Sequence, residues 1–195
     1  MDNRSVLSVA TQLDFFTEQT ETDWRLSYRC DPEVVPMADR HYNRQKIGAP
    51  GFVPPGRCHV LKIGTPEQLR TPETGAAFWV TSWPFAEYVR HAWAGAWVCS
   101  AFRNEGAGVS SELIQQAVVS TRQKWPEVPE LGMISFIDPS KVQPRPIRGR
   151  KTWGHSWFEA GFNHVGYTKG GLWTFQIAAE KIEDIFSQRV TREVS

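Results

Sequence analysis

The stretch AGAWVCSAFRNEGAGVSSELIQQAVVSTRQKW (residues 94–125) decides the fold, because it predicts a strand, a glycine loop and a helix in succession. Residues 94–102 are mostly small, β-branched or aromatic, which is typical of a strand. Residues 110–125 place one set of side chains at three- and four-residue spacing, which predicts a helix; these are Ile114, Ala117, Val118, Thr121 and Trp125. Gly106 and Gly108 lie between the two and allow backbone angles that a Cβ disfavours. Such an arrangement directs free backbone N–H groups towards an anion.

The rest of the chain alternates between further predicted strands and helices. Strands are predicted at residues 23–30, 59–63, 76–83, 132–138, 163–169 and 171–178. Helices are predicted from Pro36 to near Tyr42, at 153–162, and in the tail at 180–190. Residues 47–58 and 139–151 contain several prolines each and are predicted to be irregular loops. This order predicts an α/β domain with a mixed sheet.

Length and composition fit one globular domain with a short extension. The chain has 195 residues, of which 41% are hydrophobic and 22% charged. We assign residues 1–22 to an N-terminal extension and residues 23–195 to the domain. The formal net charge of +1 argues against a protein whose whole surface binds nucleic acid, although a local basic patch is compatible with it.

Cysteine and histidine patterns predict neither a disulfide framework nor a metal site. Cys30, Cys58 and Cys99 are widely spaced and form no CxxC motif, and the five histidines show no ligand spacing. The N-terminus has no apolar signal segment, and no run of about eighteen apolar residues occurs. We therefore expect a soluble cytoplasmic protein that does not interact with a membrane.

The glycine loop could belong to one of three kinds of phosphate-binding loop. A P-loop requires a Lys-Ser/Thr pair, which is absent, and a dinucleotide fingerprint requires a third glycine where Ser111 stands. The pyrophosphate loop of the GNAT acyltransferases has the pattern Gln or Arg, two residues, Gly, one residue, then Gly or Ala. Arg103, Gly106 and Gly108 match it at each defined position. The segments GMISFID (132–138), WFEAGF (157–162) and NHVGYT (163–168) follow in the order that this family also shows.

The chain therefore resembles the GNAT superfamily, and within it the phage DNA-modification proteins related to Mom. The resemblance to the Mom-related proteins rests on the segments ADRHYNRQ (38–45), FRNEG with SSELI (102–114), FIDPSKV (136–142) and AGF (160–162). The resemblance implies a GNAT-like, mixed and mostly antiparallel sheet flanked by helices. It also implies a phage enzyme that transfers an acyl group from acetyl-CoA, or another acyl-CoA, to an amine on a modified nucleobase in DNA. A GNAT enzyme for a small or protein amine, and a non-catalytic nucleic-acid-binding module, remain alternatives.

The resemblance also implies which residues bind the acyl-CoA. Loop N–H groups from Glu105 to Val109 would bind its pyrophosphate, assisted by the dipole of the helix that follows. Ser110 is also a candidate N-cap, which would be a purely structural role. The predicted cofactor-binding set is Arg103, Asn104, Glu105, Gly106, Ala107, Gly108, Val109, Ser110 and Ser111.

Acyl transfer to an amine needs a proton acceptor and a proton donor. The candidates are Asp138 at the end of a strand, His41 and Tyr42 in the early helix, and Arg103 pointing at the site. Asp138 precedes a proline, so it could equally initiate a turn. His41 and Tyr42 are adjacent in sequence and would not share a helix face, so a tight pair is not expected.

The sequence departs from the family where many GNAT enzymes carry a tyrosine acid. Four residues before Gly161 stands Trp157, whose indole N–H has no acid role. Either Ser156, His155 or water replaces the tyrosine, or the reaction does not use a tyrosine acid.

Candidate substrate contacts come from a basic run and nearby tryptophans. Residues 141–151 hold five basic residues and no acid, which could bind phosphates or be a solvated loop. Trp153 and Trp157 could stack on an extruded base. The predicted substrate-binding set is Arg44, Lys141, Arg145, Arg148, Arg150, Trp153 and Trp157.

Overall fold

A computed structural model of the chain describes residues 23–147 and 149–193, and it has one large sheet. The predicted N-terminal extension, residues 1–22, lies outside the described residues. The sheet has seven strands in the order β1-β2-β3-β4-β5-β9-β8. Their bounds are β1 Arg25–Ser27, β2 Arg57–Ile63, β3 Ala76–Trp83, β4 Trp97–Glu105, β5 Met133–Ile137, β8 Asn163–Tyr167 and β9 Trp173–Ile177. Among these seven strands of the described residues, β4 and β5 form the one parallel pair, so the prediction of a mixed α/β fold is confirmed.

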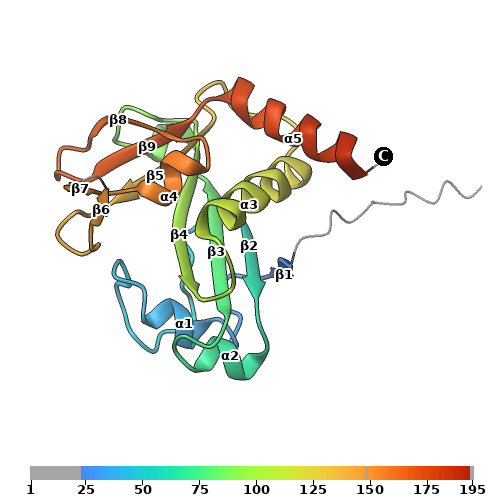
Figure 1. The fold of residues 1–195 in the computed structure, drawn as a ribbon, viewed down its shortest axis with the longest axis vertical. Helices are drawn as coiled ribbons and strands as arrows, with labels where there is room; N and C mark the ends of the chain where they lie inside the picture. The colour runs from blue at the N-terminus through green and yellow to red at the C-terminus, as the bar shows by residue number, and fades with distance from the viewer. Residues whose placement is uncertain (1–22, 148, 194–195) are drawn as a thin grey trace, which may run out of the picture.

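Among the described residues, five α-helices cover the sheet (Figure 1), and a 3-10 turn, η1 (Ala86–Tyr88), lies in the loop between β3 and β4. Helix α3 (Ser110–Lys124) connects β4 to β5, as a parallel pair requires. The other helices are α1 (Val35–Asp39), α2 (Pro66–Arg70), α4 (His155–Glu159) and α5 (Ala179–Glu193). The helix predicted at 110–125 is thus confirmed, and the predicted tail helix extends further than 190.

The two faces of the sheet carry separate hydrophobic cores. Trp79 on β3 packs in one core with Ile114 of α3 and Ile182 of α5. Phe78, its neighbour on β3, packs in the other core with Met37 of α1 and Leu69 of α2. Because successive strand residues point to opposite faces, this alternation identifies an α3 face and an α1 face.

Strands β4 and β5 separate soon after they meet. They pair only at Trp97↔Met133, Val98↔Ile134 and Cys99↔Ser135, whereas β4 continues to Glu105. A register shift in the pairing with β3 leaves Ser100 as an extra residue on β4, which is a β-bulge. Bulges increase local twist, and here the bulge follows the last residue of β4 that pairs with β5. Beyond Cys99 the sheet therefore opens between the two strands.

Two sequence predictions were wrong in detail. Helix α1 ends at Asp39 rather than near Tyr42, because the N–H of Arg40 bonds back to the helix and the chain then turns away. The segment 139–151 is not wholly irregular, since strands β6 (Arg145–Ile147) and β7 (Arg150–Thr152) form a hairpin there. A strand of three residues is too short to show the alternation of side chains that predicts a strand. Proline is also tolerated on an isolated hairpin.

His59 on β2 makes the stability of the fold depend on pH. Its side chain is buried, its Nε2 lies 2.9 Å from the Ser120 hydroxyl, and burial, with Lys124 nearby, lowers its pKa to about 4. The unfolded chain, with an ordinary histidine pKa of 6.5, binds more protons below pH 6.5. The contribution of His59 to the free energy of unfolding is therefore complete above pH 6.5 and is lost as the pH falls towards 4.

We expect the free energy of unfolding to fall by about 2 kcal/mol through His59 between pH 7 and pH 5. Urea denaturation of the natural protein and of His59→Gln at both pH values measures this loss. The glutamine variant should lose clearly less, because an amide can bond to Ser120 but does not titrate. Equal losses in the two proteins would contradict the role of His59.

Candidate functional site

The glycine loop after β4 is closed by the side chain of Asn104. Its Oδ1 accepts the N–H of Ala107 at 2.9 Å, and its Nδ2 donates to the Gly108 carbonyl and to the Ser110 hydroxyl, each at 2.9 Å. Gly106 and Gly108 have φ angles of 90° and 147°, which favour glycine at both positions. The loop is therefore preformed, and it fixes where α3 begins.

Helix α3 begins without a side-chain cap. Its N-cap is Val109, and Ser110 is the first helical residue, so the predicted capping role of Ser110 was wrong. Of the loop N–H groups predicted to bind an anion, that of Ala107 is already used by Asn104. Those of Gly108 and Val109 have no hydrogen-bond acceptor within residues 23–147 and 149–193, and the first-turn N–H groups of α3 lack intrahelical partners by geometry.

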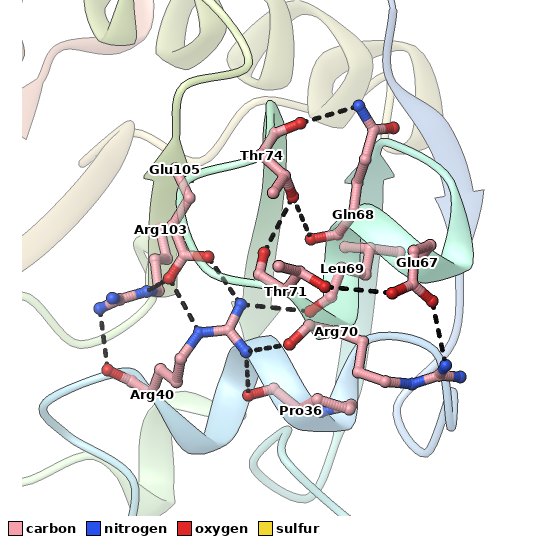
Figure 2. Close-up of polar contacts among 10 residues, drawn as sticks. All are labelled: Pro36, Arg40, Glu67, Gln68, Leu69, Arg70, Thr71, Thr74, Arg103 and Glu105. Carbon is pink, nitrogen blue, oxygen red and sulfur yellow. Dashed lines mark hydrogen bonds and ion pairs between the residues drawn. The ribbon is translucent and has the colours of Figure 1, made fainter.

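Arg103 and Glu105 do not belong to this loop, contrary to the prediction. Both lie in β4, opposite Phe78 and Ala76 of β3, and so project on the α1 face. The Arg103 guanidinium donates to Glu105 at 2.5 Å and to the Arg40 carbonyl at 2.8 Å (Figure 2). Arg103 therefore points away from the start of α3, where the anion was predicted.

Arg40 connects α1, α2 and the end of β4 (Figure 2). It forms a two-pronged ion pair with Glu105, at 3.0 and 2.6 Å, and donates to three carbonyl oxygens, those of Pro36, Leu69 and Arg70. Burial alone would raise the pKa of Glu105, but hydrogen bonds from Arg40 and Arg103 outweigh it and lower that pKa. The carboxylate is thus ionised and holds two arginines in place.

A cavity of about 150 Å³ occupies the opening between β4 and β5. It is lined by residues that follow α1, by the two strand edges and by residues of the α3 face. His41 and Tyr42 lie in it with their rings stacked, 4.6 Å between centroids and 26° between planes. The expectation that these two would not pair was wrong, because neither is helical. The other lining residues are Asn43, Cys99, Ser100, Ala101, Phe102, Ser135, Phe136, Ile137, Val142 and Trp157.

His41 is buried, with 8% of its surface exposed, and is positioned by Asn43. The Asn43 amide donates to the carbonyl of Ser100, the bulge residue, at 2.9 Å, and its Oδ1 lies 2.5 Å from His41 Nδ1. Burial, with Arg103 nearby, lowers the pKa of His41 more than the hydrogen bonds with Asn43 and with the Phe102 backbone raise it. At neutral pH the imidazole is therefore uncharged and able to accept a proton.

The Tyr42 hydroxyl crosses the opening to β5. It donates to the carbonyl of Phe136 at 3.2 Å, and although 40% of the residue is exposed, its partial burial raises its pKa above the ordinary value of 10.0. It is therefore protonated at neutral pH and is a proton donor within the cavity. The sequence did not mark this contact, which joins residues far apart in the chain.

Asp138 forms a turn, which was the alternative to a role as the catalytic base. Its Oδ1 accepts the backbone N–H and the hydroxyl of Ser140, at 2.9 and 2.6 Å, in the turn after β5. These bonds lower the pKa of Asp138, which makes it a weaker proton acceptor. Of the predicted candidates for a base, His41 has the more suitable surroundings.

The predicted substrate-binding residues do not gather at one place. Arg44 is occupied by Asp39 and by the carbonyls of Ala49 and Gly51, so it holds the loop that follows it. Trp157 lines the cavity but is buried against Trp79, Phe102 and Phe162, with only 8% of its surface exposed. This indole therefore has no open face on which an extruded base could stack.

The remaining predicted contacts lie on or near the β6–β7 hairpin. Trp153 packs on Trp173 and donates to the Val142 carbonyl. Lys141 and Arg145 are exposed. Arg148 lies outside the described residues, and only the backbone of Arg150 is described.

The central cavity adjoins two larger ones, on opposite faces of the sheet. On the α3 face, a cavity of about 200 Å³ shares Val142 and Trp157 with it and also touches Ser110 and Arg145. His155 and Ser156, the suggested substitutes for a tyrosine acid, line this second cavity. On the α1 face, a cavity of about 440 Å³ shares His41 and Asn43 with the central one. The opening between β4 and β5 thus joins the start of α3 to the His41 side.

No protein-family model matches the chain, and no curated protein or solved structure matches it. Within the described residues, no group of three or more His, Cys, Asp and Glu side chains could hold a metal ion. In the same part of the chain, no helix is long and apolar enough to cross a membrane.

Proposed function

We propose that this protein is a GNAT-like acyltransferase that moves an acyl group from a CoA thioester to an amine. The observation that carries the proposal is the opening between β4 and β5. It connects an uncapped helix start on one face with a neutral histidine and a protonated tyrosine on the other. Such an arrangement suits a two-substrate transfer, because donor and acceptor can enter from different faces and be held close together.

The α3 face suits the donor. Gly108, Val109 and the first turn of α3 offer N–H groups to a pyrophosphate, and the helix dipole favours its charge. Arg145 lines the cavity that reaches Ser110, the first residue of α3, and can add a cation. Glu105 does not oppose the phosphates, because its carboxylate is bound by Arg40 and Arg103 on the other face.

The chemistry follows from the two groups in the central cavity. A bound acyl-CoA supplies the thioester. An amine on the acceptor forms the new C–N bond as the C–S bond breaks, and His41 accepts the proton that the amine loses. Tyr42 donates a proton to the departing sulfur. Many GNAT enzymes use for this step a tyrosine at the position where this chain has Trp157. Asn43 keeps the His41 ring in position.

The acceptor that we propose is an amine on a nucleobase of phage DNA, as the resemblance to the Mom-related proteins implies. An enzyme for a small or protein amine would use the same donor site. A non-catalytic nucleic-acid-binding module would not need it, so donor binding separates that alternative from both enzymes.

Gly108→Val is expected to abolish stabilisation by acetyl-CoA. A valine is strained at a φ of 147°, so the loop must change shape and withdraw its N–H groups. The natural protein should gain about 2.7 kcal/mol of stability at a ligand concentration of one hundred times Kd, and the variant should gain almost none. Thermal unfolding with and without acetyl-CoA measures this gain.

Gly56→Val is the matched control. Gly56 also has a positive φ, 112°, and a Cβ there would meet nothing within 4 Å. It precedes Arg57, which pairs with Trp83 at the opposite end of β3 from the Ala76–Glu105 pair and the glycine loop, so its variant should carry similar strain but keep the stabilisation by acetyl-CoA. Stabilisation that persists in Gly108→Val would refute the donor site.

A further inference from the structure

A separate pocket of about 510 Å³ lies where the loop between β3 and β4 approaches the β8–β9 hairpin. Figure 1 shows that loop beside β8. Phe136 lines both this pocket and the central cavity. Met133 and Ile137 of β5 pack in the core of the α3 face, so Phe136 projects from the opposite face, where α1 lies. The pocket is thus on the acceptor side of the sheet.

Aromatic side chains form the walls of this pocket. The ring of Phe136 lies 5.2 Å from that of His91 and 6.3 Å from that of Trp93, both at steep angles. Tyr167, on β8, also borders the pocket, with its ring against those of His164 and Trp173. Half-buried aromatic rings around an open pocket suit a flat ligand that can stack.

The charge of the pocket is positive. Arg90 and Lys169 line it, both are exposed, and neither forms an ion pair within the described part of the chain. No aspartate or glutamate is among the described lining residues, which also include Ala92, Thr168, Gly170 and Leu172. Aromatic walls with unpaired cations at the rim complement a planar ring that carries a phosphate.

We propose that this pocket binds the nucleobase of the acceptor, with the adjoining phosphate on Arg90 and Lys169. The role as acceptor site rests on the proposed acyl transfer; binding of the base does not. The pocket is next to the reacting groups, because Phe136, which lines it, accepts a hydrogen bond from the Tyr42 hydroxyl through its carbonyl. The basic β6–β7 hairpin then serves the donor side, where Arg145 lines the cavity at the start of α3.

The test uses the fluorescence of 2-aminopurine, which decreases when the base stacks on an aromatic ring. One probe is a single-stranded oligonucleotide with a central 2-aminopurine, and the other is the 2-aminopurine nucleoside monophosphate. No acyl-CoA is added, so the outcome is independent of the donor site. We expect the natural protein to quench at least one probe in a saturable manner, and quenching by the oligonucleotide alone or the monophosphate alone identifies the form that is bound.

Trp93→Ala is expected to raise the Kd of the quenched probe about tenfold, because one stacking face is lost. Phe85→Ala is the control, since Phe85 is an exposed aromatic of the same loop that does not line the pocket. If Trp93→Ala does not fold, a double variant, Arg90→Ala with Lys169→Ala, gives the test. For the oligonucleotide, it should reduce the slope of log Kd against log salt by about one.

Absence of quenching with both probes would overturn the proposal, as would equal Kd values for Trp93→Ala, Phe85→Ala and the natural protein. If the pocket does not bind the base but acetyl-CoA binds the protein, the protein would still be a transferase, with another acceptor. Quenching without any binding of acetyl-CoA would instead leave a nucleotide-binding protein and remove the proposed function.

Discussion

Replacing His41 with glutamine is expected to lower the turnover number of acyl transfer by about 10²- to 10⁴-fold. Glutamine can keep a hydrogen bond to Asn43 but cannot accept a proton from an amine. The imidazole is buried, uncharged at neutral pH and fixed by Asn43, which makes it the best placed acceptor in the cavity. Release of the free CoA thiol, measured with saturating acetyl-CoA and an amine acceptor, gives the turnover number.

His59→Gln is the control for His41→Gln. His59 is equally buried but packs against Ser120 and Trp125 on the α3 face, and it lines none of the cavities described above. At pH 7 its replacement should leave the turnover number within a few fold. Similar turnover numbers in His41→Gln and in the control would exclude His41 as the base. The Kd of acetyl-CoA should be nearly unchanged in both variants, because neither residue lies at the glycine loop.

Glu105→Gln is expected to lower the free energy of unfolding by about 3 kcal/mol, because one substitution leaves two guanidinium groups without their counter-charge. The Glu105 side chain is 5% exposed, while those of Arg40 and Arg103 are 22% and 33% exposed. Water reaches the arginines in part, which places the expected loss at the lower end of the range for a broken buried pair. Urea denaturation at pH 7 measures it.

Glu67→Gln provides the comparison for Glu105→Gln. Glu67 pairs with Arg70 on the surface of α2, where the two side chains are 76% and 67% exposed. Such a pair contributes about 0.5 kcal/mol or less. If both variants lost equal stability, the network in Figure 2 would not be what joins α1 to β4.

The order of elements was predictable because the decisive signals are local. The face of α3, the runs at 76–83 and 94–102, and the glycines at 106 and 108 each depend on residues close in sequence. The structure confirms the strand, loop and helix in that order and a mixed sheet. The short β6–β7 hairpin was missed, since three-residue strands leave no pattern.

The orientation of the site residues was less predictable. Arg103 and Glu105 fit a loop motif, but β4 extends to Glu105, and strand alternation then turns both side chains to the α1 face. Asn43 was missed because its role depends on the carbonyl of Ser100, which a bulge places nearby. His41 and Tyr42 were found, but their stacking could not be, because it follows from where α1 ends.

The most direct test of the proposed transfer is mass spectrometry of nucleosides from DNA incubated with the protein and acetyl-CoA. The DNA should include bases that carry an aminoalkyl group, with unmodified DNA alongside. We predict an acetylated nucleoside whose amount grows with time and with protein, and which His41→Gln reduces at least a hundredfold. If acetyl-CoA binds the protein saturably but neither DNA yields an acetylated nucleoside, DNA acylation by this protein is contradicted.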